Sequence, residues 1–328
     1  MIRLAVIDIG TVTARLAIAD VEDGRVLSMR RQSTIVNLGQ DVDKSGRLRE
    51  DACARLLACV DGYVAQIREA DAQQTCCTLT SAARDASNSA ALLGQLAERG
   101  LKAQVIPGEV EGKLTFLGVA QDFPNTRLLV ADNGGGSTEF ALGALASGSD
   151  GANAQLDLEF VQSINVGCRR ITEKFLSREN PPSAADIQAA HEFAAQSFAP
   201  ISARFTQAPQ RLVVTGGTST TLVAIKKALV PYDSARVHLA SLSQSEIEEQ
   251  ARRLAAITVK ERAELPGIQP QRAPVILGGA IAVCEVLRVS GLDTLTVSES
   301  DLLMGLSLNL AAAVAEAPSP VGWVPELD

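Results

Sequence analysis

The sequence is poor in aromatic residues and in positive charge. Only 3% of its residues are Phe, Trp or Tyr, and its formal net charge is −8. Base stacking on aromatic rings and phosphate neutralisation by Lys and Arg are the main sources of nucleic-acid affinity. We therefore expect no nucleic acid among the partners. An anionic ligand would need a local arrangement of Arg, Lys and backbone amides, together with a divalent cation, to bind against the overall field.

The sequence also lacks any apolar stretch of about 20 residues, the length that a membrane-spanning helix requires. Near the N-terminus, the charged residue Asp8 comes before the hydrophobic region of a signal peptide could form. We therefore expect a protein with no membrane partner.

Histidine is scarce, and cysteine shows no metal-binding spacing. The two histidines, His191 and His238, stand alone, and the six cysteines include no Cys-x-x-Cys pair. This pattern excludes a zinc site and argues against a mechanism driven by histidine. The cysteines are expected to be reduced core thiols, which indicates a cytoplasmic protein.

At 328 residues, 46% of them hydrophobic, the chain is long enough for two domains with separate cores. A β-hairpin meander over residues 3–31 opens the chain, and strands and amphipathic helices then follow one another, which indicates an α/β protein. We expect a loop over 143–151 and a loosely held tail from Ala317. Helices are predicted over residues 49–70, 109–122, 186–205, 243–257 (opened by a Ser243–Glu246 capping box), 272–287 and 302–315. The core-facing stripe of the first helix is predicted to be Ala54, Leu57, Val60, Val64 and Ile67.

The stretch 127–143 carries the densest site chemistry. A buried strand over 128–131 ends at an acid, and a triple glycine, two hydroxyls and a second acid follow it. Successive backbone N–H groups in such a turn form an anion-binding concavity, which predicts a phosphate cradle flanked by two carboxylates. The alternative is a hairpin whose glycines only make a tight turn. The residues concerned are Asp132, Gly134, Gly135, Gly136, Ser137, Thr138 and Glu139.

The same order of strand, acid, glycine and hydroxyl occurs at the first turn, with Asp8, Gly10 and Thr11. It is partly repeated over 213–220, which contains Gly217 and Thr218. A repeated turn of this type suggests two related halves that face one cleft.

Two further residues are candidates from their positions alone. Arg84 follows a strand end, where its guanidinium either grips a phosphate in a bidentate manner or pairs with Asp85 at the surface. Glu109 and Glu111 both lie in the first turn of a predicted helix, where acids ordinarily complement the helix dipole. Position alone favours that role for Glu109. For Glu111 it leaves a second alternative open, in which the side chain points into the cleft.

Six motifs occur in one order and spacing and together resemble the exopolyphosphatase and guanosine pentaphosphate phosphohydrolase family over residues 3–310. They begin at Asp8, Thr80, Ile106, Asp132, Gly167 and Thr215. The resemblance implies an α/β protein of the actin-like ATPase superfold with ribonuclease H-like topology. Two α/β domains, each with a five-stranded sheet, would flank a cleft. Residues 1–122 plus about 302–328 would form domain I, and 123–301 domain II.

The resemblance also implies roles for individual residues. Glu111 would be the catalytic glutamate that orients or deprotonates the attacking water, and Glu139 would be the second catalytic acid. Asp8 and Asp132 would lie near Mg²⁺ or another divalent cation. The substrate or phosphate would be bound by Gly10, Thr11, Arg84, Gly134, Gly135, Gly136, Ser137, Thr138, Gly217 and Thr218.

The implied activity is that of an exopolyphosphatase, which removes terminal orthophosphate from inorganic polyphosphate, and the implied assembly is a homodimer. Guanosine pentaphosphate exposes the same terminal phosphoanhydride and is an alternative substrate. A sugar-kinase-like or chaperone-like ATPase and a non-catalytic sensor of polyphosphate or an alarmone are alternatives of other classes.

Three features depart from the family pattern. Val12 stands where the family commonly has an amide side chain, so phosphate contact at this position is not expected. The segment 301–305 lacks the basic and acidic residues of the family's Gly-Leu-Arg-Glu-Gly. The C-terminal helical region of longer members, with its HD-type metal motif, has no counterpart, and two histidines cannot form one.

Overall fold

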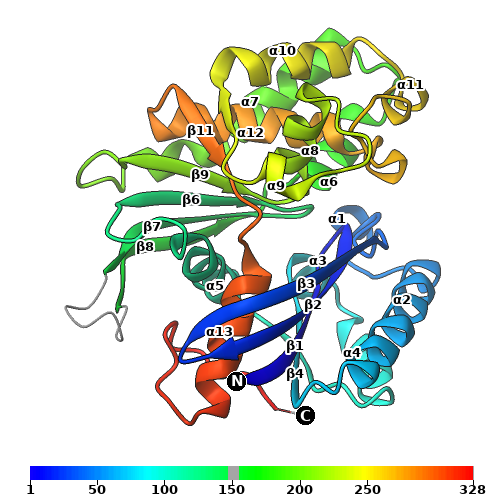
Figure 1. Ribbon diagram of the computed structural model, residues 1–328. Helices are drawn as coiled ribbons and strands as arrows, with labels where there is room; N and C mark the ends of the chain where they lie inside the picture. The colour runs from blue at the N-terminus through cyan, green and yellow to red at the C-terminus, as the bar shows by residue number, and fades with distance from the viewer. Residues whose placement is uncertain (147–154, 328) are drawn as a thin grey trace. The chain divides into compact units, whose positions relative to one another are not determined.

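The computed structural model describes residues 1–146 and 155–327. The chain divides into two compact units (Figure 1). Unit 1 consists of Met1–Gln121 and Asp301–Asp328, and unit 2 consists of Asp122–Ser300. Each unit has its own β-sheet and its own cluster of buried apolar side chains. None of the helices in the described ranges combines the length and apolar character needed to cross a bilayer.

The sheet of unit 1 has five strands in the order β3-β2-β1-β4-β5. The first three strands form an antiparallel meander, whose tight turn at Asp23-Gly24 has positive φ at both residues, as a two-residue hairpin requires. The other two strands pair in parallel, and helices connect them. The strands are β1 (Ile2–Ile9), β2 (Thr13–Glu22), β3 (Arg25–Ile35), β4 (Gln74–Leu79) and β5 (Ala103–Val105).

The main helix on one face of this sheet is α2 (Glu50–Glu69), and its predicted stripe faces the core at every position but Ala54. Val60 and Ile67 are buried, Leu57 and Val64 are partly buried and pack against the core, and Ala54 is exposed. Tyr63 sets the rotation of the helix, because its hydroxyl donates to Ala14 O of β2 at 2.9 Å and its ring fills the core. The buried residues are Ala52, Leu56, Val60, Tyr63 and Ile67. The short helices of this part are α1 (Val42–Ser45), α3 (Ser81–Asp85) and α4 (Ser89–Ala97).

Helices α5 (Gly108–Ala120) and α13 (Leu302–Val314) pack closely on one another, and α13 lies along β1 and β2 (Figure 1). Gly118 and Gly305 permit the close crossing, since a Cβ on either would collide with the backbone of the other helix. The tail after α13 is not loosely held, contrary to the prediction. Asn309 Nδ2 donates to Trp323 O at 3.0 Å, and Glu326 N donates to the side chain of Gln104 beside β5 at 2.9 Å.

The sheet of unit 2 has six strands in the order β10-β11-β9-β6-β7-β8, one more than predicted. The additional strand is β10, a three-residue segment that pairs antiparallel with β11 at one edge. The loop predicted over 143–151 was wrong for 143–146, because β7 continues there, and 147–154 lie outside the described residues. The strands are β6 (Leu128–Asn133), β7 (Thr138–Ala146), β8 (Gln155–Ile164), β9 (Arg211–Thr215), β10 (Ser241–Ser243) and β11 (Thr294–Val297).

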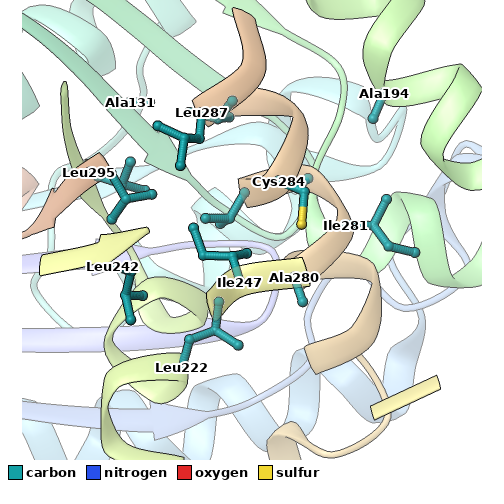
Figure 2. Close-up of a cluster of buried hydrophobic side chains, with 14 of the residues drawn as sticks. Ala131, Ala194, Leu222, Leu242, Ile247, Ala280, Ile281, Cys284, Leu287 and Leu295 are labelled. Atoms are coloured by element: carbon teal, nitrogen blue, oxygen red, sulfur yellow. The ribbon is translucent and has the colours of Figure 1, made fainter. Parts of the chain in front are cut away.

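The core of unit 2 is built around α12 (Ile276–Ser290), an apolar helix that is buried along nearly its whole length. Figure 2 shows Ile281, Cys284 and Leu287 of this helix in the same cluster as side chains from other elements. The predicted capping box is confirmed, because Ser243 and Glu246 exchange backbone-to-side-chain hydrogen bonds. The other helices are α6 (Cys168–Ile171) with a π-helical turn (Thr172–Leu176), α7 (Ala184–Ser202), α8 (Gly217–Lys226), α9 (Ser234–Val237), α10 (Gln244–Ala255), α11 (Val259–Ala263) and a 3₁₀ turn (Pro270–Arg272).

Candidate active site

The first predicted turn, after β1, is closed by a hydrogen bond from Gly10 N to Thr13 O at 2.9 Å. Thr11 is nearly buried, and its methyl group occupies the space that a Cβ at Gly39 would need. Val12 is also buried, and its carbonyl accepts hydrogen bonds from Val36 N and Asn37 N. The side chain that departs from the family pattern therefore faces protein, and the turn is held in place by the segment that follows β3.

The carboxylate of Asp8, at the end of β1, accepts hydrogen bonds from Arg15 of β2. Arg15 donates through Nε and Nη2 to Asp8 Oδ2, at 2.9 and 2.6 Å, and through Nη1 to Asp301 Oδ2 at 2.5 Å. Asp8 Oδ1 is buried and has no hydrogen-bond partner. Burial raises the pKa of the Asp8 carboxyl, and the positive charge of Arg15 opposes this shift. One carboxylate oxygen is thus fixed by protein, while the other remains available.

Glu111 lies in the first turn of α5 and is only 7% exposed. Arg84 Nη1 donates to Glu111 Oε2 at 2.7 Å and to Ile106 O at 3.0 Å. Neither alternative considered for Arg84 from the sequence anticipated this pairing with Glu111. Glu109 behaves differently, because its largely exposed side chain pairs with Lys113 at 2.6 Å. The two acids of one helical turn are therefore separated, one at the surface and one in the interior.

The triple glycine of unit 2 forms a turn whose carbonyl groups are all bound by the segment that opens α6. Cys168 N donates to Gly134 O at 3.0 Å, Arg169 N to Gly135 O at 2.9 Å, and Arg170 Nε to Gly136 O at 2.9 Å. In a trans peptide the N–H points away from the C=O. The amides of Gly135, Gly136 and Ser137 are therefore directed to the side opposite α6, as an anion-binding turn requires.

Close backbone approach explains the glycine at position 167, which faces the turn. A Cβ on Gly167 would come within 2.5 Å of the carbonyl carbon and oxygen of Gly135. None of the three glycines of the turn has positive φ. The backbone of the turn and the backbone before α6 thus lie in direct contact, which leaves no room for a side chain at Gly167.

The hydroxyl of Thr138 is used inside the protein. It donates to Val166 O at 2.6 Å and accepts from Asn133 Nδ2 at 3.0 Å, and the residue is fully buried. These bonds give Thr138 a structural role in holding the turn, and its phosphate contact stays a prediction.

The two acids around the turn, Asp132 and Glu139, are direct cross-strand partners on β6 and β7. Both are nearly buried, and Ser163 Oγ donates to Glu139 Oε1 at 2.6 Å. Residues directly opposite on antiparallel strands have Cβ atoms about 4.5 to 5.5 Å apart, so the two carboxylates share one face of the sheet. Such a pair attracts a cation.

The second turn of unit 2 follows β9, beside the first. Gly216 has φ of 101°, which favours glycine, and a Cβ on it would approach Asn133 O to 2.6 Å. Helix α8 begins at Gly217, so its first amides form the positive end of a helix dipole. The guanidinium of Arg272 occupies the space where a Gly217 side chain would lie. Thr218, next along the helix, is buried against Gly279.

Each unit thus brings together part of the predicted set. In unit 1, the set consists of Asp8, Gly10, Thr11, Arg84 and Glu111. In unit 2, it consists of Asp132, Gly134 to Ser137, Thr138, Glu139, Gly217 and Thr218.

Three arginines at these turns were not predicted: Arg15, Arg170 and Arg272. A signal for Arg272 existed, since it is a charged residue immediately before a long apolar helix. Arg15 follows Asp8 at a spacing that places the two opposite one another in a hairpin. We find no such signal for Arg170, because its hydrogen bond to Gly136 O depends on the position of α6.

The residues present fit a divalent cation such as Mg²⁺. Mg²⁺ is bound in proteins by one or two carboxylates, with water and substrate phosphate completing the octahedron. In unit 1, Asp8 Oδ1 is a buried oxygen with no hydrogen-bond partner, and in unit 2, separately, Asp132 and Glu139 supply two adjacent carboxylates. The described residues contain no group of three or more His, Cys, Asp or Glu that could hold a metal ion.

Comparison with known proteins gives consistent matches. The sequence profile of the Ppx/GppA phosphatase family matches residues 17–312. Exopolyphosphatase 2 of Mycobacterium tuberculosis is 34% identical, and the match covers 94% of this chain and 98% of that protein.

Two solved structures are similar over nearly the whole chain. The crystal structure of an exopolyphosphatase-like protein has a TM-score of 0.84 at 30% identity and covers 95% of this chain and 100% of that one. The Ppx/GppA family member from Aquifex aeolicus has a TM-score of 0.76 at 30% identity and covers 96% and 98%. These likenesses confirm the predicted α/β fold of the actin-like type.

Proposed function

Since the chain belongs to the Ppx/GppA phosphatase family, and is thus a hydrolase of phosphoanhydride bonds, we propose that it is an exopolyphosphatase. It releases terminal orthophosphate from inorganic polyphosphate by attack of water, with a divalent cation as cofactor. The observation that carries this proposal is the buried Glu111 held by Arg84. An acid with only a dipole role would be exposed, as Glu109 is.

The proposed chemistry uses little covalent catalysis. Phosphoryl transfer from an anhydride depends on positioning and on neutralising charge on the transferred group. The amides of Gly135, Gly136 and Ser137 bind the terminal phosphate, and the N-terminus of α8 binds a neighbouring one. Glu111 orients the water and accepts its proton, and Arg84 holds Glu111 in place.

A divalent cation would supply charge neutralisation at the phosphate oxygens. Asp8 is the candidate ligand in unit 1, and Asp132 and Glu139 are the candidates in unit 2, which adds a cation role to the catalytic one expected for Glu139. Mg²⁺ as the physiological ion, a homodimeric assembly and a cytoplasmic location belong to the same proposal, and the family resemblance supports them.

The test compares orthophosphate release by the wild type and Glu111→Gln, with and without Mg²⁺. Loss of a general base costs about 10²- to 10⁴-fold, so we expect turnover of the variant to fall by at least about 100-fold while polyphosphate binding is retained. Glu109→Gln is the matched control, because it removes an acid from the same helical turn at the surface. Turnover equal to wild type in Glu111→Gln would refute the role of this residue.

The choice of substrate decides between the proposal and its alternatives. Faster release of phosphate from guanosine pentaphosphate than from long polyphosphate would favour the phosphohydrolase. ATP turnover without polyphosphate turnover would favour an ATPase, and polyphosphate binding without any turnover would favour a sensor.

A further inference from the structure

The carboxylate of Asp8 is fixed by a cross-strand partner. Asp8 and Arg15 are opposite one another on β1 and β2, and two N–H groups of Arg15 converge on Oδ2. This grip leaves the carboxylate little rotation, so the direction of the unpartnered Oδ1 is set by the sheet. The sheet itself is rigid here, because β1 is flanked on both sides by paired strands.

The position of Arg15 is set in turn by Asp301, the residue with which the chain re-enters unit 1. The two carboxylate oxygens of Asp301 have separate tasks. Oδ2 accepts from Arg15 Nη1, and Oδ1 accepts from Leu303 N at 3.0 Å and caps α13. The backbone of Asp301 is also confined, since its carbonyl lies against Gly118 of α5, the helix that carries Glu111.

We propose that Arg15 and Asp301 are positioning residues that prepare Asp8 to bind a divalent cation through Oδ1. The proposal rests on the proposed function of the same site. Arg15 supplies orientation, but alone its positive charge would cancel that of Asp8 and repel a cation. Asp301 offsets the charge of Arg15, and Arg84, whose positive charge also acts on Asp8, is itself paired with Glu111.

The burial of the three side chains makes this charge balance effective. The Asp8 side chain is 4% exposed, that of Asp301 12% and that of Arg15 20%. Water and salt screen such a group poorly, so removing one charge changes the local field more than it would at the surface.

Titration with Mn²⁺ alone, followed by the electron paramagnetic resonance signal of the free ion, tests the proposal without reference to turnover. The variants are Asp301→Asn and Arg15→Lys. Asparagine keeps the oxygen that caps α13 but loses the charge that faces Arg15, and lysine keeps the charge but loses the two-point grip. We expect the dissociation constant of Mn²⁺ to rise about tenfold or more in each, as is usual when a residue behind a metal ligand is changed.

The same two strands provide a matched control. Arg3 and Asp20 are also direct cross-strand partners on β1 and β2, with Nε and Oδ1 2.8 Å apart, but they are far along the strands from Asp8. Asp20→Asn and Arg3→Lys should leave Mn²⁺ binding unchanged. Thermal unfolding of all four variants checks that each is folded.

Unchanged Mn²⁺ affinity in both folded variants of Arg15 and Asp301 would refute the proposal. Asp301 would then serve only to cap α13. Absence of Mn²⁺ binding by the wild type would refute it as well. Failure of the proposed function can be told apart from failure of this proposal. In that case the wild type would release no phosphate from polyphosphate, but it would still bind Mn²⁺ more tightly than the variants of Arg15 and Asp301.

Discussion

Asp132 on β6 lies directly opposite Glu139 on β7, so two nearly buried carboxylates occupy one face of the sheet beside the glycine turn. Like charges in this arrangement destabilise a sheet by a few tenths of a kcal/mol up to about 1 kcal/mol. The arrangement is useful where a cation or the charge of a substrate complex is to be bound. We therefore expect stability and the proposed function to be opposed at these two positions.

The repulsion between the two carboxylates predicts how Glu139→Gln changes stability and activity. The glutamine keeps an oxygen for the hydrogen bond from Ser163 but removes one of the two negative charges. We expect the thermal unfolding midpoint to stay equal or to rise, while phosphate release from polyphosphate falls by about 100-fold. Differential scanning fluorimetry and a phosphate-release assay measure the two quantities. A variant that loses stability and activity together would instead indicate a structural role for Glu139.

Arg84 and Glu111 are expected to be coupled energetically as well as catalytically. Removing Arg84 leaves the carboxylate of Glu111 without its 2.7 Å partner in a largely buried position. We expect Arg84→Met to destabilise unit 1, and the further change Glu111→Gln to recover part of the loss, because the uncompensated charge is then removed. Urea unfolding of both single variants and the double variant should give an interaction free energy of about 0.5 to 3 kcal/mol. Additive effects of the two substitutions would contradict a direct interaction.

The contact between Gly167 and Gly135 predicts a large functional effect from one methyl group. A Cβ at Gly167 would approach backbone atoms of Gly135, which can yield only if the turn moves. We expect Gly167→Ala to lower phosphate release by about 100-fold, since displacement of a binding group by about 1 Å has that effect. The matched control is Gly94→Ala on α4, where a Cβ meets nothing within 4 Å. This substitution should stabilise the protein by about 0.5 to 1 kcal/mol. Wild-type turnover in Gly167→Ala would show that the turn tolerates the shift.

The sequence was informative where one short segment holds both the chemistry and the geometry. Around the triple glycine, the strand, the turn and the flanking acids are consecutive, so local patterns were enough to predict them. The strand pairing that sets Asp132 against Glu139 follows from a hairpin with a four-residue connection, yet the two were predicted only as flanking acids.

Features that depend on distant segments were missed. Arg15 and Asp301 are 286 residues apart in sequence, and no local pattern relates them. The predicted stripe of α2 wrongly included Ala54 and missed Tyr63, whose hydroxyl bonds Ala14 of a strand distant in sequence. The tail was predicted to be loosely held because its proline-rich composition gives no indication of the hydrogen bond that Trp323 O accepts from Asn309 or the one that Glu326 N donates to Gln104.

The stability of unit 2 should depend on pH through Glu159 and Arg127. Arg127 donates to both oxygens of Glu159, at 2.5 and 2.7 Å, and also to Gln207 and Ala208 carbonyls before β9. The hydrogen bonds from Arg127, opposed in part by desolvation, hold the pKa of the Glu159 carboxyl below its usual value of 4.5. The folded state therefore binds this proton less tightly than the unfolded state does.

The sign of the effect follows from this difference. The contribution of Glu159 to stability is fully present above pH 4.5, and it is lost as the pH falls from there through the lower pKa of the folded state. We expect Glu159→Gln to be less stable than the wild type at pH 7, and the difference to shrink steadily below pH 4.5. Urea unfolding at several pH values measures this difference. A difference for Glu159→Gln that stays constant down to the acid limit of folding would mean that the ion pair does not contribute to stability.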